Sequence, residues 1–118
     1  EMCIRDSSDI DRAQIEQVLI NLIKNAKESC GQNTAPQIEV ELEQVPGKVC
    51  SLTVRDNGEG ILPEVIDKVF VPFFTTKPSG SGIGLSLCKQ IMNLHGGTIT
   101  VSSEIGKGSC FTLMFPGR

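Results

Sequence analysis

The stretch GSGIGLSL, residues 80–87, places glycines at alternate positions directly before an apolar-periodic segment that ends at His95. This pattern is typical of a loop that opens a helix. A glycine backbone approaches a ligand closely and adopts positive φ at little steric cost, and the free amides at a helix start favour an anion. The stretch therefore indicates either a hinge that cradles phosphate or a plain turn with a helix cap.

The composition is that of one ordinary folded domain. The chain has 118 residues, 39% hydrophobic and 21% charged, with a formal net charge of −3, and this size suits a single core. The negative charge and the scarcity of aromatic residues argue against nucleic-acid binding. No apolar run is long enough to cross a membrane, and no signal peptide is visible. We therefore expect a cytoplasmic domain that makes no membrane contact.

The cysteines predict neither a metal site nor a disulfide framework. They are odd in number, widely spaced, and form no CxxC pair. We expect small buried apolar residues in a reducing compartment. They are Cys3, Cys30, Cys50, Cys88 and Cys110.

Apolar spacing predicts helices and strands in a definite order. Steps of three and four predict a helix from about residue 14 to 30, which Asp9 or Asp11 caps, and a second helix that ends at His95. Pro63 opens a short helix that ends near Val69. Alternation predicts strands, which are 37–43, 50–55, 98–102 and 109–115.

This order predicts an α+β fold, a two-layer sandwich. Hairpin-linked strands favour a mixed, mostly antiparallel sheet with the long helices packed on one face. Residues 1–8 show no period, and we expect a disordered or truncated edge there. The domain then comprises residues 9–118.

Two motifs place polar side chains beside the predicted core. Asn21 and Asn25 share a helix face at i and i+4, and an amide oxygen suits Mg²⁺ that keeps waters and phosphate oxygens as its other ligands. The loop DNGEG, residues 56–60, begins with Asp56 at a strand end. An ionised carboxylate only accepts hydrogen bonds, so it suits a donor such as an exocyclic amine. Solvated helix residues and a plain Asx turn are the alternatives.

The segment FVPFFTTK, residues 70–77, crowds phenylalanines into a predicted loop. A solvated loop does not need them, so we expect these side chains to dock on the core as the root of a lid. Lys77 would then meet a phosphate as a point charge. A loop that fills the core and leaves Lys77 exposed is the alternative.

Taken together and in order, the motifs resemble those of sensor histidine kinases. QVLINLIKNAKES, DNGEGI, FVPFFTTK, GSGIGLSLCKQIMNLHGGTI and GKGSCFTLMFP are similar to the N box, first glycine box, F box, second glycine box and closing strand of that family, and the short lid resembles the nitrogen-regulation type. The resemblance covers nearly the whole chain. It implies a Bergerat-type ATP-binding domain that uses ATP and Mg²⁺.

The resemblance assigns roles to individual positions. Asn25 would bind Mg²⁺ with Asn21 beside it, and Asp56 would accept from the adenine amino group. Ile61 and Val69 would wall the adenine, and the hydroxyl of Ser109 would complete its water network. The further ATP-binding positions that it implies are Gly58, Gly60, Phe73, Thr76, Lys77, Gly80, Ser81, Gly82, Gly84 and Leu85.

Two departures qualify these roles. Glu28 stands where many relatives carry a cation, so the lid would supply the cationic phosphate contact. Asn21 stands where the ATP-hydrolysing cousins place a general-base Glu, and an amide accepts no proton from water, so hydrolysis should be slow. His95, the chain's one histidine, sits at a helix end, where a structural role suits it.

The resemblance implies a phosphoacceptor histidine on a separate dimerisation domain, through which the protein would dimerise, and a response regulator further on. Two alternatives remain open. One is a serine kinase of the anti-sigma-factor type, and the other is a nucleotide-gated interaction module without phosphoryl transfer.

Overall fold

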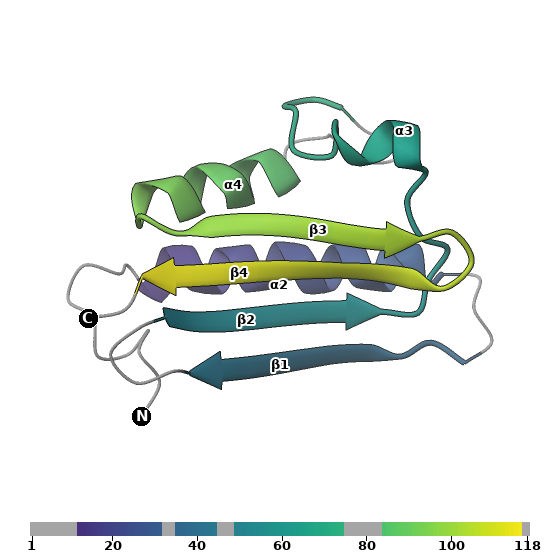
Figure 1. Cartoon of the computed structure of the whole chain (residues 1–118), viewed down its shortest axis with the longest axis horizontal. Coiled ribbons are helices and arrows are strands. Elements are labelled where there is room, and N and C mark those ends of the chain that lie inside the picture. The colour runs from purple at the N-terminus through teal and green to yellow at the C-terminus, as the bar shows by residue number, and fades with distance from the viewer. Residues whose placement is uncertain (1–11, 32–34, 45–48, 75–83, 117–118) are drawn as a thin grey trace.

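The computed structural model describes residues 12–31, 35–44, 49–74 and 84–116. The four strands in these residues form one antiparallel sheet of order β1-β2-β4-β3 (Figure 1). The elements are α2 (Arg12–Ser29), β1 (Ile38–Gln44), β2 (Val49–Asp56), α3 (Pro63–Ile66), α4 (Gly84–Leu94), β3 (Thr98–Glu104) and β4 (Gly108–Pro116).

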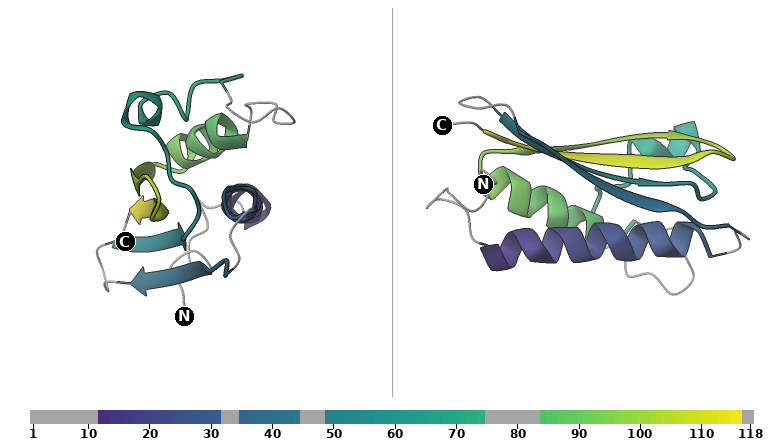
Figure 2. Two further views of the ribbon diagram at one scale, coloured as in Figure 1. Left: turned by 90° about the vertical axis from the view of Figure 1, so that its right-hand side faces the viewer. Right: turned by 90° about the horizontal axis from the view of Figure 1, so that it is seen from below.

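Helices α2 and α4 lie side by side on one face of the sheet, and no described helix covers the other face (Figure 2). Alternate residues of the strands point toward the helices, because successive side chains of a strand lie on opposite faces. The two-layer α+β sandwich that the sequence predicts is therefore confirmed. All described strand pairs are antiparallel.

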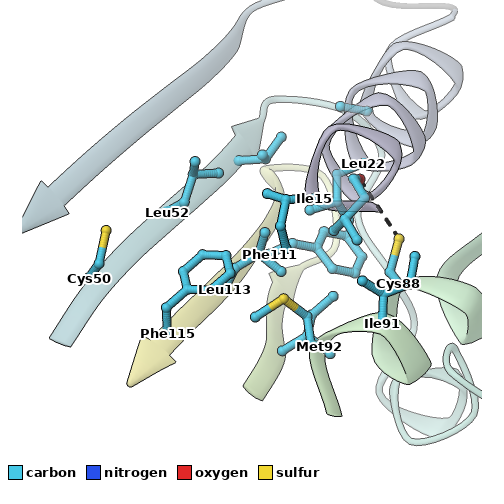
Figure 3. Packing of buried hydrophobic residues seen from close by; sticks show 14 residues of the cluster. Ile15, Leu22, Cys50, Leu52, Cys88, Ile91, Met92, Phe111, Leu113 and Phe115 are labelled. Carbon is cyan, nitrogen blue, oxygen red and sulfur yellow. Dashed lines mark hydrogen bonds between the residues drawn. The ribbon is translucent and has the colours of Figure 1, made fainter. Parts of the chain in front are cut away.

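Helix α2 forms because its apolar residues recur every three or four positions and so share one stripe. Ile15, Val18, Leu22 and Ala26 are all buried on this stripe. They meet inward-facing residues of β4 such as Phe111, together with the buried face of α4 (Figure 3). This core fixes α2 against the sheet and so determines where its polar side points.

Helix α4 ends in a glycine cap. The Gly97 amide donates to the Met92 carbonyl at 2.9 Å, and the Gly96 amide donates to the Asn93 carbonyl at 3.1 Å. Gly96 has φ of 73°, so the pair forms a Schellman motif, which satisfies carbonyls that a helix end leaves open. The glycines predicted to stop this helix therefore do so.

Most elements lie within one or two residues of their predicted bounds, and two differences bear on the site. Helix α3 ends at Ile66 rather than near Val69, and residues 67–70 continue as a turn. Strand β3 runs to Glu104, two residues past the predicted end. The extension places Ser103 on the same face as Ile99, toward the helices.

The cysteine prediction holds for three residues and is wrong for one. Cys30, Cys50 and Cys88 are buried, and the described cysteines are free thiols. Cys110 is half-buried on the outer sheet face, where it pairs with Arg55 across β2 and β4. Cys3 lies outside the described residues.

Among the described helices, none is long and apolar enough to cross a membrane.

Candidate functional site

Asp56 is a buried carboxylate at the end of β2. Its residue is 5% exposed, and its Oδ1 accepts a hydrogen bond from the Gly58 amide at 2.8 Å. That bond closes the Asx turn which sequence alone offers as the plain alternative. This hydrogen bond uses one oxygen of the Asp56 carboxylate. The other oxygen of the same buried carboxylate takes no part in the turn. The turn and a binding role are therefore compatible.

Ser109 lies directly opposite Asp56 in the pairing of β2 with β4. It is also 5% exposed, and its Oγ lies 3.1 Å from the Oγ of Ser103 on β3. Asp56, Ser109 and Ser103 thus form one polar row across three neighbouring strands, on the face that carries the helices. Two buried polar positions in one row mark this sheet end as different from the apolar rows behind it.

The DNGEG loop packs against the last turn of α2. The Glu59 amide donates to the Ser29 carbonyl at 3.3 Å. A Cβ added to Gly58 would overlap the Ser29 side chain and carbonyl, so only glycine fits there. The loop that carries Asp56 is therefore held at the carboxyl end of α2.

A second set of polar side chains, the α2 row, links the DNGEG loop to the start of α4. Asn21, Asn25 and Ser29 follow one another at i, i+4 and i+8, so they lie along one side of the helix. Ser29 touches Gly58 at one end of the row. At the other end, a Cβ added to Gly84 would lie 4.0 Å from the Asn21 Cγ. Three motifs that are distant in sequence thus meet along this row.

Asn21 and Asn25 are half-buried rather than fully solvated. Asn21 Oδ1 accepts a hydrogen bond from Gln17 Nε2 at 3.4 Å, and the Cys88 thiol on α4 donates to the Val18 carbonyl of α2 at 3.8 Å. Burial raises the pKa of the Cys88 thiol to about 11, so the thiol stays protonated near neutral pH. The contact between Cys88 and Val18 therefore ties α4 to α2.

Asn57 has a scaffolding role. Its Nδ2 donates to the Ala35 carbonyl at 2.9 Å, and its Oδ1 accepts from the Gln37 amide at 2.8 Å. The Cys30 thiol approaches the same oxygen at 3.5 Å. Asn57 thereby holds the segment that leads into β1. Its neighbour Asp56, and not Asn57, belongs to the polar row.

The hairpin between β3 and β4 closes over the loop from the other side. The Gly106 amide donates to the Glu59 carbonyl at 3.0 Å. Gly60 has φ of 83°, and a Cβ on it would lie 2.6 Å from the Glu104 carbonyl oxygen. The small size of Gly60 therefore serves packing against the hairpin, in addition to any room that it leaves for a base or a water.

Phe70 docks on the core as expected, and Phe73 does not. The Phe70 ring meets Phe111 edge to face with centroids 6.3 Å apart, and Lys89 Nζ of α4 lies 5.4 Å from the Phe70 centroid. Phe73 is 74% exposed with φ of 68°. The prediction that all phenylalanines of this segment dock on the core is therefore wrong at Phe73, because the chain reverses there and turns its ring outward.

Ile61 and Val69, the positions expected to wall the adenine, and Leu85, a further predicted ATP-binding position, are all partly buried. Ile61 and Leu85 also pack against the core. His95 hydrogen-bonds the Ile91 carbonyl through Nδ1 at 2.8 Å, which fits its predicted place at a helix end. The predicted positions outside the described residues are Thr76, Lys77, Gly80, Ser81 and Gly82.

Ser103 and Gly108 are not among the site residues that the sequence predicts. A Cβ on Gly108 would overlap the Asp56 carbonyl oxygen, so glycine alone lets β4 approach the carboxylate-bearing residue. Ser103 lies one residue beyond the predicted strand. Its alternation with Ile99 and Val101 is the available signal, because it marks a polar residue at an inward position.

No group of three or more His, Cys, Asp or Glu side chains that could hold a metal occurs in the described part of the chain. The α2 row offers the amide oxygens of Asn21 and Asn25, with which a metal would combine ligands from a bound molecule or water. That donor set fits Mg²⁺ that arrives with a phosphate ligand.

Comparison with known proteins agrees with this geometry. Residues 10–118 match the family described as histidine kinase-, DNA gyrase B-, and HSP90-like ATPase. The chain is 41% identical over 106 residues to the sensor histidine kinase ZraS of Escherichia coli (strain K12), which covers 90% of this chain and 22% of ZraS. It thus spans about a fifth of the length of such relatives.

Solved structures share the fold. The catalytic domain of histidine kinase ThkA superposes with a TM-score of 0.78 at 39% identity, covering 91% of this chain and 68% of that one. Full-length ShkA in complex with AMPPNP superposes with a TM-score of 0.79 at 25% identity, covering 92% of this chain and 23% of ShkA. The likeness therefore extends to a protein whose structure was solved in complex with AMPPNP.

Proposed function

The chain belongs to the family of histidine kinase-, DNA gyrase B- and HSP90-like ATPases, and we propose that it is the Mg-ATP-binding catalytic domain of a sensor histidine kinase. The observation that carries this proposal is the buried carboxylate of Asp56, where the α2 row, the DNGEG loop and the β3–β4 hairpin meet. A group that only accepts hydrogen bonds suits the donor amine of adenine.

The adenine would lie against the polar row at the sheet end. Asp56 accepts from the exocyclic amine through the oxygen that Gly58 does not use, and Ser109 takes part in the water network beside it. Ile61, Val69 and Leu85 supply the apolar walls. The complex of ShkA with AMPPNP supports an adenine nucleotide as the ligand.

Asn25 would provide the protein ligand for Mg²⁺, which neutralises phosphate charge when bound. It lies one helical turn from Asn21 and one from Ser29, between the Gly84 end of the row and the DNGEG loop. Asn25→Ala should therefore remove the Mg²⁺ dependence of nucleotide affinity. A titration with ATP in Mg²⁺ and in EDTA measures this, and an unchanged dependence would place the metal elsewhere.

The lid completes the proposal, and its residues remain predictions from sequence. Lys77 would contact the phosphates as a point charge, and Thr76 would line the same side. Together with Ser81, the amides of Gly80 and Gly82 would hold the triphosphate at the start of α4. The short lid also leads us to assign the nitrogen-regulation type within the family.

The γ-phosphoryl would pass to a histidine outside this chain. Positioning and charge neutralisation dominate such a transfer, and the amide of Asn21 offers no general base that would activate water. The acceptor is a histidine on a dimerisation domain of a longer, cytoplasmic or membrane-anchored parent, which then serves a response regulator. Relatives about five times as long as this match are in keeping with such a domain.

One mixing experiment tests the reaction. The chain is incubated with γ-labelled ATP, Mg²⁺ and a separately produced dimerisation-helix protein that bears an acceptor histidine. Label on that histidine supports the proposal. Label on a serine of a partner protein would instead indicate an anti-sigma-factor-type kinase, and tight ATP binding without any transfer would indicate a nucleotide-gated interaction module.

A further inference from the structure

Ser103 is the centre of a small hydrogen-bond network beside Asp56. Its Oγ lies 2.7 Å from the Ile61 amide nitrogen, 2.9 Å from the Gly108 carbonyl oxygen and 3.1 Å from the Ser109 Oγ. These partners are Ile61, directly after the DNGEG loop, and Gly108 and Ser109 at the start of β4. One hydroxyl on β3 therefore joins the end of this loop to the start of β4.

The partners determine which way each hydrogen bond runs. A serine hydroxyl has one proton to donate and two lone pairs that accept. The Gly108 carbonyl only accepts, so Ser103 donates its proton there, and the Ile61 amide only donates, so it takes one lone pair. The remaining lone pair of Ser103 then accepts from Ser109, whose hydroxyl is the donor of that bond.

Ser109 is consequently left with acceptor character alone. Its single proton goes to Ser103 on β3, so it offers other groups only its lone pairs, and Asp56 is its cross-strand partner on β2. The ionised carboxylate of Asp56 also only accepts. A ligand that lies against the Asp56 carboxylate and the Ser109 hydroxyl must therefore supply a hydrogen-bond donor.

We propose that Ser103 is a positioning residue that sets the nucleobase preference of the site, by holding Ser109 as a hydrogen-bond acceptor beside Asp56. This inference rests on the proposed ATP-binding function. A purine with a 6-amino group presents a donor to this pair, whereas a 6-oxo purine presents an acceptor and is rejected. Without Ser103, the Ser109 hydroxyl rotates freely and donates to a 6-oxo group.

The test compares ATP with ITP, in which a 6-oxo group replaces the 6-amino group. Dissociation constants for both Mg-nucleotides are measured by calorimetry on the 118-residue chain and on Ser103→Ala. We expect ATP affinity to fall about fivefold, as for loss of a hydrogen-bonded partner. ITP affinity should fall less, so that the preference for ATP over ITP shrinks at least about threefold.

Three further variants separate this role from a merely structural one. Ser103→Thr keeps the hydroxyl and should restore the preference, and the exposed neighbour in Ser102→Ala should change nothing. In a Ser109→Ala background, Ser103→Ala should not reduce the preference again, because the group it orients is gone. If Ser103→Ala does not fold, Ser103→Cys takes its place in the test under the same criteria. Cysteine keeps the side-chain volume and weakens all three hydrogen bonds.

Each outcome decides the matter. A smaller ATP preference with rescue by Thr supports the proposal. Equal losses for ATP and ITP, or no loss for either, would overturn it while leaving ATP binding intact. Absence of ATP binding by the unmodified chain would be seen before any variant is made, and it would overturn the proposed function and this inference together.

Discussion

At the scale of single residues, Asp56 and Asn57 are adjacent in the chain and serve different ends. Asp56 is buried in the polar row, whereas Asn57 hydrogen-bonds the Ala35 carbonyl and the Gln37 amide. Asp56 is the last residue of β2 and shares the inward face of Leu52 and Val54, whereas Asn57 lies just beyond the strand. The proposed ligand-binding role of Asp56 and the scaffolding role of Asn57 can therefore be told apart by substitution.

Asp56→Asn should weaken ATP binding with little loss of stability. The new amide keeps an oxygen for the Gly58 amide but can no longer accept with full charge from an adenine amine. We expect about a tenfold loss of ATP affinity, the scale of a charged hydrogen bond. Purine riboside triphosphate, which lacks the amine, should lose much less in a parallel titration. Equal losses for the two nucleotides would remove the assigned role of Asp56.

Asn57→Ala serves as the matched control with the opposite outcome. It deletes both hydrogen bonds to the segment before β1 and should lower the free energy of unfolding by about 1–3 kcal/mol. Urea unfolding measures the loss. ATP affinity per folded molecule should stay near that of the unmodified chain, and a selective loss of affinity would mean that Asn57 itself meets the nucleotide.

Cys88 gives the fold a pH dependence on the alkaline side. Burial raises its pKa from 9.0 to about 11, so between these values the unfolded chain has released a proton that the folded chain keeps. The contribution of Cys88 to stability therefore falls as pH rises through this window, by about 3 kcal/mol in total, and is fully present well below pH 9. Comparing urea unfolding of the unmodified chain and Cys88→Ala from pH 8 to 11 isolates this slope. Parallel pH profiles would contradict it.

At the scale of elements, the β3–β4 hairpin depends on two glycines for different reasons. Gly108 has φ of 131° and approaches the Asp56 carbonyl so closely that a Cβ would overlap it, whereas Gly106 has φ of 82° with nothing within 4 Å. A side chain at position 106 would therefore suffer backbone strain alone. A side chain at position 108 would suffer both strain and a clash with the Asp56 carbonyl. The two positions form a natural pair for measurement.

Gly106→Ala should lower the free energy of unfolding by about 1 kcal/mol, the usual cost of a left-handed residue. Gly108→Ala should lower it by more than about 3 kcal/mol, because the hairpin must also move away from β2. Chemical unfolding of both variants gives the two values. Equal losses of unfolding free energy in the two variants would show that the close approach of Gly108 to Asp56 adds nothing to the cost of the substitution.

Element positions are largely predictable from the sequence, and the network between them is not. The three-and-four spacing of Ile15, Val18 and Leu22 and the glycines after α4 indicate both long helices without any tertiary information. Ser103 and Gly108 acquire their roles only through strand pairing, which local patterns do not encode. The prediction for Phe73 is wrong because apolar character predicts burial on average, and a positive φ overrides it at one residue.

At the scale of the whole molecule, the site and the one histidine lie at opposite ends of α4. Gly84 begins the helix beside Asn21, and His95 follows its end, hydrogen-bonded to Ile91. A helix of 11 residues is about 16 Å long. A phosphoryl group held near Gly84 therefore cannot reach His95 while the fold is intact.

The isolated chain should consequently bind Mg-ATP yet remain unphosphorylated. Incubation with γ-labelled ATP should leave the protein without acid-labile, base-stable label, while the same sample labels an added helical protein that bears an acceptor histidine. His95→Gln should transfer to that acceptor at an unchanged rate, because the helix end where His95 bonds the Ile91 carbonyl lies far from the proposed nucleotide site. Label on the chain itself that His95→Gln abolishes would mean that α4 opens far enough to bring its end to the γ-phosphate, and the separation of donor and acceptor between two domains would then have to be abandoned.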